Sequence, residues 1–439
     1  MTVIASDTLL PARRGSARRW DGRGADRLSV AAQDRFALGL VRLAICGLPI
    51  LLPQAPANST PADLVIAMAM GSTLLWAAYS HGRLTVPYRL GVGAMVIAGL
   101  VSGLVGRWPG LALLSLVQDL FLLAWAATLA TLLHGAAALD KVLRTWVWSA
   151  AAWGVAFVVR TTQSAVTAGP DASRVSFTFG DQNAAGLYFV LSLLIMIATG
   201  RPRSRVARML IGAVFLLATF YTGSLGAISG ALLGVACGVV LGVGDRRGLA
   251  AAVALAASLV LATASITVLV QRGNLVAAAH ESSHPLIRNS LGREAQSSSE
   301  RAVLRAESFR LWRSSDVLGS GPATTKDLLK AEQAPYAKEA HNDWLATLIE
   351  RGLLGVIGLL LLSAELVVRG HGTWARSRLD PALRGVLARP AYLTGALACV
   401  LAFSVTHEVL HDRTVWSLFG IVAATAFVNR QAHQANQGA

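Results

Sequence analysis

Long apolar runs, separated by short polar segments, follow one another along most of the chain. Each run could cross the hydrocarbon core of a membrane, roughly 30 Å thick, as a single helix. The pattern therefore predicts an all-α, polytopic integral membrane protein with about twelve transmembrane helices. We place these helices near residues 36–55, 62–80, 86–105, 110–133, 145–167, 184–199, 209–223, 226–243, 249–270, 349–368, 391–408 and 414–428.

One polar interruption is much longer than the others and covers residues 271–348. A segment of this length is too long for a simple connection, so we expect it to contain short helices and to carry the function. The predicted organisation has five parts: a disordered basic tail over 1–35, transmembrane helices over 36–270, a catalytic loop over 271–348, further transmembrane helices over 349–428, and a second tail over 429–439.

The distribution of basic residues predicts how the chain is oriented. Lys and Arg are enriched in short cytoplasmic loops. If the N-terminus is cytoplasmic, the loops on that side hold most of the basic residues, whereas the short loops on the other side hold Arg107, Arg174 and Arg413. We therefore predict a multi-pass membrane protein, with both termini in the cytoplasm and the loop 271–348 outside it.

Composition supports the membrane assignment and argues against nucleic acid as a partner. The chain is 54% hydrophobic and 14% charged, whereas soluble domains contain about 25% charged residues. The net charge of +15 would suit a nucleic-acid-binding protein, but basic cytoplasmic loops account for it, so no nucleic-acid partner is expected. Cys46, Cys237 and Cys399 lie far apart in apolar runs, which suits packing residues better than a disulfide or a metal site.

A regular glycine pattern occurs in the eighth predicted helix. The glycines recur at every fourth position: Gly226, Gly230, Gly234, Gly238 and Gly242. This spacing places them on one helix face, where the missing side chains let a neighbouring backbone approach closely. We interpret the face as a helix-packing surface; a lipid-binding groove is the alternative.

The long loop contains a predicted helix with paired arginines. Ser297 and Glu300 have the spacing of a capping box, which predicts a helix that begins there, and neither Gly nor Pro interrupts it as far as Arg313. Helical spacing places these residues on one face: Arg301, Arg305, Ser308 and Trp312. Two guanidinium groups side by side suit a diphosphate, because each binds phosphate oxygens through two hydrogen bonds. The alternative is that they pair with Glu307 or with lipid headgroups.

The end of the loop places a histidine beside the membrane. Asn342 or Asp343 could cap the helix that continues into the tenth predicted span. His341 then lies just outside the first turn, at the membrane surface. A neutral imidazole there could take a proton from a hydroxyl group. A solvated helix start is the alternative.

Further polar residues are predicted on the same side of the membrane. Arg174, Asp181 and Asn183 precede the sixth predicted span, either as part of a site or as interface anchors.

Arg160 lies near the outer end of the fifth span. Because an arginine within a span costs a few kcal/mol, its side chain should reach the interface or a polar cavity. Arg42 and Arg89 raise the same question. Asp119, inside the fourth span, is either the mid-membrane ionisable group of a transporter or a capped or paired carboxylate that lines the same cavity.

Taken in order, these motifs resemble the O-antigen ligase and O-antigen polymerase (Wzy-type) family of membrane glycosyltransferases. The family pattern combines an arginine, a Gly-x-Gly turn, a His-Asn pair and a Glu-x-Gly-x-x-Gly segment. The matching residues are Arg301, Gly319, Gly321, His341, Asn342, Glu350, Gly352 and Gly355. The segment 174–183 and the number of predicted spans also agree with the family.

The resemblance implies a GT-C-like fold and a metal-independent glycosyltransferase without a cofactor. Such an enzyme moves a glycan from a polyprenyl diphosphate such as undecaprenyl diphosphate to an acceptor hydroxyl on a lipid or glycan. The reaction takes place at the outer face of the inner membrane, in the biosynthesis of surface polysaccharides such as lipopolysaccharide. By resemblance His341 is the base and Arg301 binds the diphosphate. We add as donor ligands Arg305, Arg174 and Arg160, and as supporting residues Asn342, Asn183, Asp181 and Glu350.

The chain departs from the family pattern at one position. The family usually has Ser-Arg-Gly before the eighth span, and that arginine helps to hold the donor. This chain has Ser224, Leu225 and Gly226. Three explanations are open: another arginine substitutes for the missing one, the donor differs, or the activity has been lost.

Other functions are also compatible with the sequence. A ligase and a polymerase differ in the acceptor, and nothing in the sequence separates them. A secondary transporter would have the same layout, but transporters tend to have repeated halves, and the first half of this chain contains no copy of the long loop. A structural membrane scaffold is a further alternative.

Overall fold

The computed structural model describes residues 23–52, 59–80, 82–168, 176–272, 277–278, 281–282, 294–335 and 340–437. Within these ranges the chain forms helices and no β-strand, which confirms the all-α prediction. By length and composition, seven helices could cross a membrane: α2 (Pro61–Tyr79), α4 (Pro109–Leu132), α5 (Ala136–Ala168), α6 (Gln182–Thr199), α7 (Arg205–Thr222), α8 (Leu225–Arg247) and α14 (Asp343–Ser377). Four more apolar segments lie in α3 (Arg89–Val105), α9 (Leu249–Arg272), α16 (Ala391–Phe403) and α17 (Arg413–Gln437).

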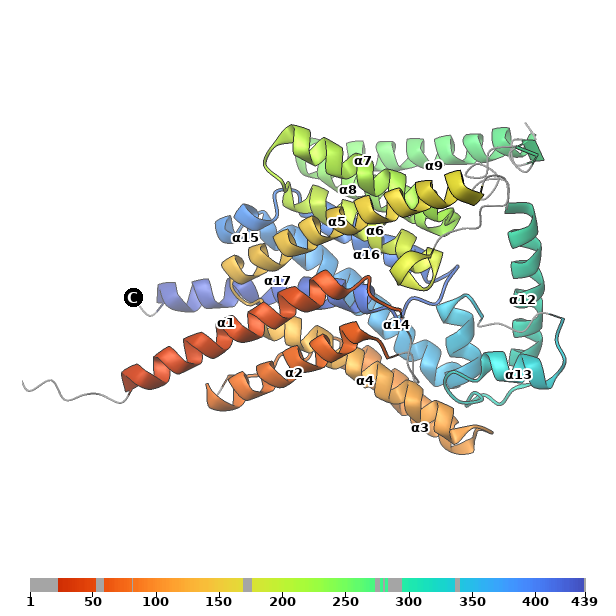
Figure 1. Cartoon of the computed structure of the whole chain (residues 1–439), viewed down its shortest axis with the longest axis horizontal. Coiled ribbons are helices and arrows are strands. Elements are labelled where there is room, and N and C mark those ends of the chain that lie inside the picture. Colours follow the sequence, from red (N-terminus) through yellow and green to blue (C-terminus); the bar gives the residue numbers. More distant parts are fainter. Residues whose placement is uncertain are drawn as a thin grey trace, which may run out of the picture.

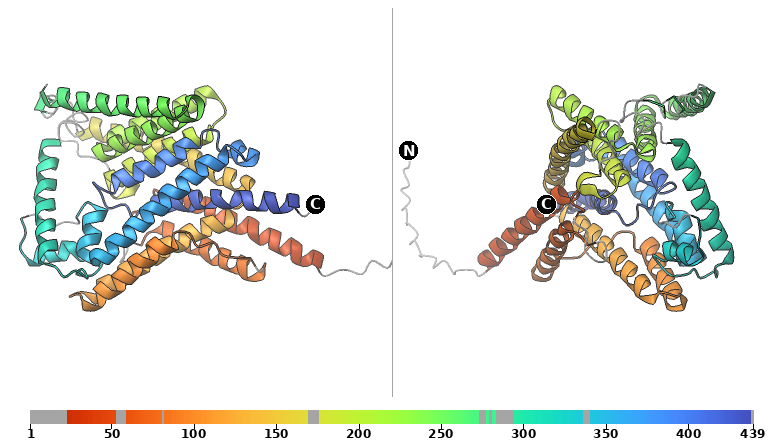
Figure 2. Two further views of the ribbon diagram at one scale, coloured as in Figure 1. Left: turned by 180° about the vertical axis from the view of Figure 1, so that it is seen from behind. Right: turned by 45° about the vertical axis from the view of Figure 1, so that its right-hand side comes forward.

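The helices form a bundle whose two ends differ. At one end, α12 (Glu294–Ser314) lies across the ends of the bundle helices, beside the short helix α13 (Thr325–Ala331) (Figure 1). At the other end, α1 (Arg23–Gly47) begins and α17 finishes, as the reverse view also shows (Figure 2). We call these the loop end and the terminal end. The two termini of the described chain therefore lie on the same side of the bundle.

Helix α6 lies at the centre of the bundle, and nearly all of its side chains from Ala185 to Met196 are buried. Neighbouring helices bring aromatic side chains against it, and their polar atoms find partners. Trp146 of α5 donates to the hydroxyl of Ser192 at 2.9 Å. Burying the indole against the core while satisfying its N–H group stabilises the packing of α5 on α6.

The glycine face of α8 packs against α16, as the four-residue spacing predicted. A Cβ atom at Gly230 would lie 2.8 Å from the Cys399 sulfur, and one at Gly234 would lie 2.9 Å from the Gly395 carbonyl oxygen. Gly242 faces open space. The helix-packing interpretation is therefore confirmed for this part of the face, because larger side chains would force the two helices apart.

Three helix boundaries differ from the predicted ones. Helix α1 begins at Arg23, inside the segment predicted to be a disordered tail, and α12 begins at Glu294, before the cap predicted at Ser297. Helix α14 begins where the predicted cap places it but continues past residue 368, the end of the predicted apolar span, to Ser377. In each case polar residues continue the helix past the point where the hydropathy pattern stops, so the apolar run alone does not mark the helix end.

Candidate functional site

The backbone around His341 is held in an uncommon conformation. His341 has φ 49°, a left-handed value that few residues other than glycine adopt. Its N–H group donates to Glu408 Oε1 at 3.1 Å. Next to it, Asn342 caps α14, and its side-chain oxygen accepts from the N–H groups of Trp344 at 2.9 Å and Leu345 at 3.0 Å. Of the two caps that the sequence allowed, the structure uses Asn342.

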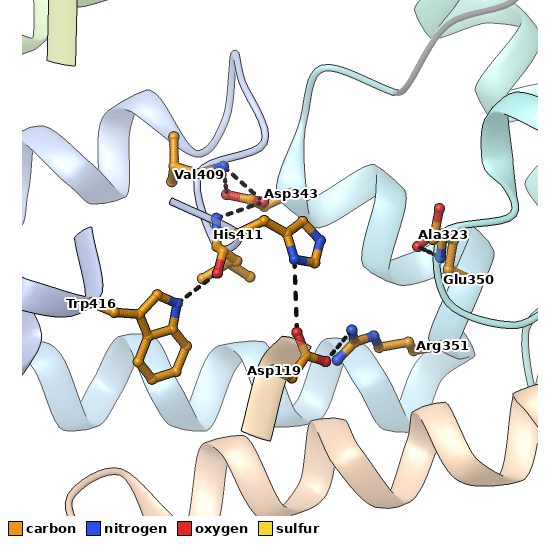
Figure 3. A network of polar contacts seen from close by, with 9 residues as sticks. Asp119, Ala323, Asp343, Glu350, Arg351, Val409, His411 and Trp416 are labelled. Atoms are coloured by element: carbon orange, nitrogen blue, oxygen red, sulfur yellow. Dashed lines mark hydrogen bonds and ion pairs between the residues drawn. The ribbon is translucent and has the colours of Figure 1, made fainter. Parts of the chain in front are cut away.

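Asp343 joins the start of α14 to the loop between α16 and α17 through hydrogen bonds. Its buried carboxylate accepts from Val409 N, with distances of 3.0 and 3.2 Å to the two oxygens, and from Leu410 N at 3.4 Å (Figure 3). The Asp343 N–H group in turn donates to the Ser404 carbonyl oxygen at 2.9 Å. These bonds fix the position of His341 relative to the segment 404–412.

A small cavity joins His341 to the arginines of α12. It has a volume of about 160 Å³, and we call it the basic cavity. Its lining residues are Arg301, Leu304, Arg305, Ala340, His341, Asn342, Val405 and Thr406. The structure therefore brings together Arg301, Arg305 and His341, which the sequence analysis selected from two separate segments.

Glu307, which the sequence analysis gave as an alternative partner for Arg301 and Arg305, pairs with a different arginine. Glu307 pairs with Arg310 at 2.8 Å, and Arg310 also reaches Glu332 at 2.6 Å. Neither Arg301 nor Arg305 forms an ion pair with a described residue. Their guanidinium groups can therefore bind an anionic ligand without first releasing a carboxylate from the described part of the chain.

A second cavity, of about 370 Å³, lies on the other side of His341. We call it the polar cavity, and its ionisable and amide lining residues are Gln118, Asp181, Asn183, His341, His407, Glu408, His411, Asp412 and Arg413. Among the described residues, His341 is the only one that lines both cavities. Asp181, predicted to support the site, caps α6 and accepts from Asn183 N at 3.2 Å.

The polar cavity contains a second histidine close to the first. The ring centroids of His341 and His407 are 5.9 Å apart with nearly perpendicular planes, and His407 also packs on Phe403 at 4.6 Å. A Cβ atom at Gly226 of α8 would lie 3.2 Å from the His407 ring, so this glycine lets α8 approach the site. Partial burial raises the pKa of Asp412 above its ordinary value, because burial disfavours the ionised carboxylate.

The Gly-x-Gly turn at 319–321 packs directly on the Glu-x-Gly-x-x-Gly segment at 350–355. In the turn 319–321, Ser320 N donates to the Ile349 carbonyl oxygen and Gly321 N donates to the Glu350 carbonyl oxygen, both at 2.9 Å. Gly352 interrupts the helical conformation of α14 with φ 62°. A Cβ atom at Gly352 would lie 2.0 Å from the Val317 carbonyl oxygen, so only glycine allows this contact.

Glu350 holds the same turn rather than facing His341. Its carboxylate accepts from Ala323 N at 2.8 Å (Figure 3). It also accepts from the hydroxyl of Thr325 at 2.7 Å. Thr325 is the first residue of α13, so the carboxylate fixes the path from the Gly-x-Gly turn into that helix. Glu350 lines neither the basic nor the polar cavity, and its support of the site is therefore architectural.

We predict that Gly352→Ala destabilises the protein more than a matched glycine substitution. Gly248 also has a positive φ, of 85°, but open space surrounds the position of its missing Cβ atom. Gly248→Ala should therefore cost only the strain of a backbone conformation that is essentially restricted to glycine, roughly 1–3 kcal/mol, whereas Gly352→Ala adds a steric clash with the turn. Thermal unfolding of the two purified variants would measure the difference, and equal melting temperatures would contradict the packing described here.

A buried ion pair lies one residue before the helix break. Arg351 donates to Asp119 Oδ2 of α4 at 2.5 Å, and the side chains are 5% and 11% exposed. Nδ1 of His411 lies 3.8 Å from the other Asp119 oxygen, so the pair adjoins a residue of the polar cavity (Figure 3). The acidic residue that the sequence places inside the fourth span thus has a basic partner from α14.

Two of the predicted donor ligands are not brought to His341 by the described structure. The Arg160 side chain is exposed on α5 and lines neither cavity. Arg174 lies outside the described residues. Leu225 also lines neither cavity, and the arginines of the basic cavity come from α12.

The segment between α16 and α17 lines the polar cavity, although the sequence did not indicate a role for it in the site. This segment contributes His407, Glu408, His411 and Asp412 to the polar cavity. The available signal was the density of ionisable side chains in "THEVLHDR", residues 406–413, between two apolar runs. Only contacts distant in sequence, such as the one from Glu408 to His341, show that this segment faces the long loop.

Comparison with known families supports the motif assignment. The family model Wzy_C, described as O-Antigen ligase, matches residues 187–360. The matched segment contains Arg301, the turn 319–321, His341 and the Gly352 helix break, but not the segment 404–412. A comparison with curated proteins gives no match. The resemblance to the O-antigen ligase family that the motifs predicted is thus confirmed over residues 187–360, the part of this membrane protein that the O-antigen ligase model matches.

Proposed function

We propose that this protein transfers a glycan from a polyprenyl diphosphate to an acceptor hydroxyl at the loop end of the bundle. The loop end then faces outward from the bacterial inner membrane, the chain crosses the membrane about twelve times, and both termini are cytoplasmic. The O-antigen ligase domain supports such a role in polysaccharide biosynthesis. One observation carries the proposal: His341 lines both a cavity that contains two arginines and a cavity rich in histidines and carboxylates.

The basic cavity suits the donor diphosphate. Arg301 and Arg305 line it, and none of its described lining residues is a carboxylate. When the glycosidic bond to the carrier breaks, the diphosphate gains negative charge, and fixed guanidinium groups stabilise that charge in the transition state. Val405, an apolar side chain that is 53% exposed, also lines the cavity and offers a hydrophobic contact for the carrier chain.

The polar cavity suits the acceptor. Carboxylates and imidazoles accept or donate hydrogen bonds to sugar hydroxyls, whereas Asp181, Glu408 and Asp412 disfavour a second diphosphate. His341 can then take the proton of the acceptor hydroxyl as its oxygen attacks the anomeric carbon. The bond between that carbon and the diphosphate oxygen breaks, and the carrier leaves as the free diphosphate. In this proposal the arginines stabilise the charge without a divalent metal.

The test is a transfer assay with the purified protein in proteoliposomes. The donor is an undecaprenyl diphosphate glycan, offered with either a lipid anchor or a second lipid-linked repeat as acceptor. A glycosylated anchor indicates a ligase, and a longer lipid-linked glycan indicates a polymerase. Whichever product forms should also form in the presence of a metal chelator. A donor that crosses the bilayer without forming a new glycosidic bond would identify a transporter and contradict the proposal.

We predict that Arg301→Ala weakens the use of the donor. A hydrogen bond to a charged group contributes about 1.5–3 kcal/mol, so kcat/KM for the donor should fall roughly 10- to 150-fold. Arg313→Ala is the matched control, because this arginine lies on the same helix, packs over the Phe309 ring and does not line the basic cavity. Equal losses in the two variants would contradict a specific role for Arg301.

A further inference from the structure

A third cavity, of about 850 Å³, opens at the terminal end of the bundle. It lies between the segment 83–90 and parts of α14 and α17, and we call it the arginine cavity. Its charged and aromatic lining residues include Arg83, Tyr88, Arg89, Glu365, Arg369 and Arg376. None of these residues lines the basic or the polar cavity around His341, so the proposed glycan transfer does not use this site.

The arginine cavity lies far along α14 from the break at Gly352. With a rise of about 1.5 Å per residue counted from that break, Glu365 lies roughly 20 Å along the helix and Arg376 roughly 36 Å. The hydrocarbon core of a bilayer is about 30 Å thick. Close packing of α3 on α14 fixes the cavity walls, since a Cβ atom at Gly91 would lie 2.5 Å from the Leu362 backbone nitrogen. The cavity therefore lies toward the membrane–water interface at the terminal end.

The charge of the arginine cavity favours an anion. Arg83 and Arg89 are exposed and form no ion pair with the described residues, and Arg369 lies over the Tyr88 ring at 5.0 Å. Glu365 is the carboxylate of the lining, and it accepts from Gly91 N at 3.3 Å. Arginines thus outnumber the carboxylate, and guanidinium groups bind phosphate oxygens in pairs.

Apolar side chains adjoin these arginines and are open to the surroundings. Leu90 is 71% exposed and Val368 is 69% exposed, and Leu361 extends the same lining toward the centre of α14. Apolar surface next to a charged group suits a ligand that is itself amphipathic. An anion with a hydrocarbon chain therefore fits this cavity better than a free inorganic ion does.

We propose that the arginine cavity binds the headgroup phosphate of an anionic phospholipid from the leaflet at the terminal end. The phosphate lies among Arg83, Arg89 and Arg369, and the acyl chains follow Leu90, Leu361 and Val368. Basic pockets between membrane helices attract anionic headgroups, and each nearby arginine contributes about 1 kcal/mol to that attraction. The site is independent of glycan transfer.

The experiment measures lipid binding to the purified full-length protein by native mass spectrometry. Phosphatidylglycerol is the probe, and phosphatidylcholine, inorganic phosphate and undecaprenyl phosphate are the comparison ligands. The double variant Arg83→Gln/Arg89→Gln removes two exposed arginines, at about 1 kcal/mol each, and should bind phosphatidylglycerol on the order of 30-fold more weakly. The control Arg203→Gln/Arg205→Gln changes two exposed arginines just before and at the start of α7 and should bind as the unmodified protein does.

A substitution that should strengthen the binding of phosphatidylglycerol provides a second test. Glu365→Gln removes the carboxylate but keeps an oxygen that can accept from Gly91 N, so it should tighten the binding of phosphatidylglycerol. Equal binding by the two double variants would overturn the proposal, as would equal binding of phosphatidylglycerol and phosphatidylcholine. Tighter binding of inorganic phosphate or of undecaprenyl phosphate would overturn the assignment to a phospholipid.

Discussion

Replacing His341 with alanine is expected to lower the turnover number for glycan transfer by about 10²- to 10⁴-fold, the usual contribution of a positioned general base. The reason is its location: the imidazole lines both the basic cavity and the polar cavity, so it adjoins the proposed donor and acceptor at once. The variant should still fold, because the hydrogen bond that His341 makes to Glu408 uses its backbone N–H group.

Two sets of controls make the His341 result specific. His371→Ala removes an exposed imidazole that contacts Trp374, far along α14, and should leave turnover unchanged. His407→Ala and His411→Ala test the other histidines of the polar cavity and should cost less than His341→Ala, since neither lines the basic cavity. A His341→Ala protein with normal turnover would refute the assignment of the base.

Arg351→Ala is expected to cost about 3–5 kcal/mol of stability, the usual effect of removing one member of a buried ion pair. The substitution leaves the Asp119 carboxylate buried without its guanidinium partner. Replacing both residues with apolar ones, as in Asp119→Leu/Arg351→Met, should recover most of that loss, because no charge then remains buried. Thermal unfolding in detergent would measure both effects.

An exposed ion pair provides the control for this prediction. Arg144 pairs with Asp140 one helical turn away, and its side chain is 50% exposed. Arg144→Ala should therefore cost less than about 1 kcal/mol. If Arg351→Ala and Arg144→Ala shift the melting temperature equally, the Asp119–Arg351 pair does not stabilise the contact between α4 and α14.

Features that depend on neighbouring residues could be predicted from the sequence. Hydropathy located the bundle helices, residue type and position limited the cap of α14 to Asn342 or Asp343, and the glycine spacing of α8 predicted a close contact with a neighbouring helix, which the structure shows to be α16. The arginine face of α12 was also predictable from helical spacing, although the helix begins earlier than the capping box indicated. Each of these features depends on a local period or on a short motif.

Features that depend on distant contacts could not be predicted in this way. Asp119 and Arg351 are 232 positions apart, and no local pattern pairs them. Glu350 appears in the family motif, yet only the structure shows that it holds the turn before α13. The segment 404–412 reaches the site because Asp343 and the His341 backbone bind it, which is a property of the folded chain.

The central claim is that the donor diphosphate binds beside His341, between Arg301 and Arg305. The most direct measurement is a cryo-electron microscopy structure of the protein with a non-transferable polyprenyl diphosphate glycan. We expect diphosphate density within hydrogen-bonding distance of both guanidinium groups, with the anomeric carbon facing the His341 ring and the polar cavity. Density for the diphosphate in the arginine cavity, or beside Arg160 on α5, with the basic cavity empty, would contradict the account.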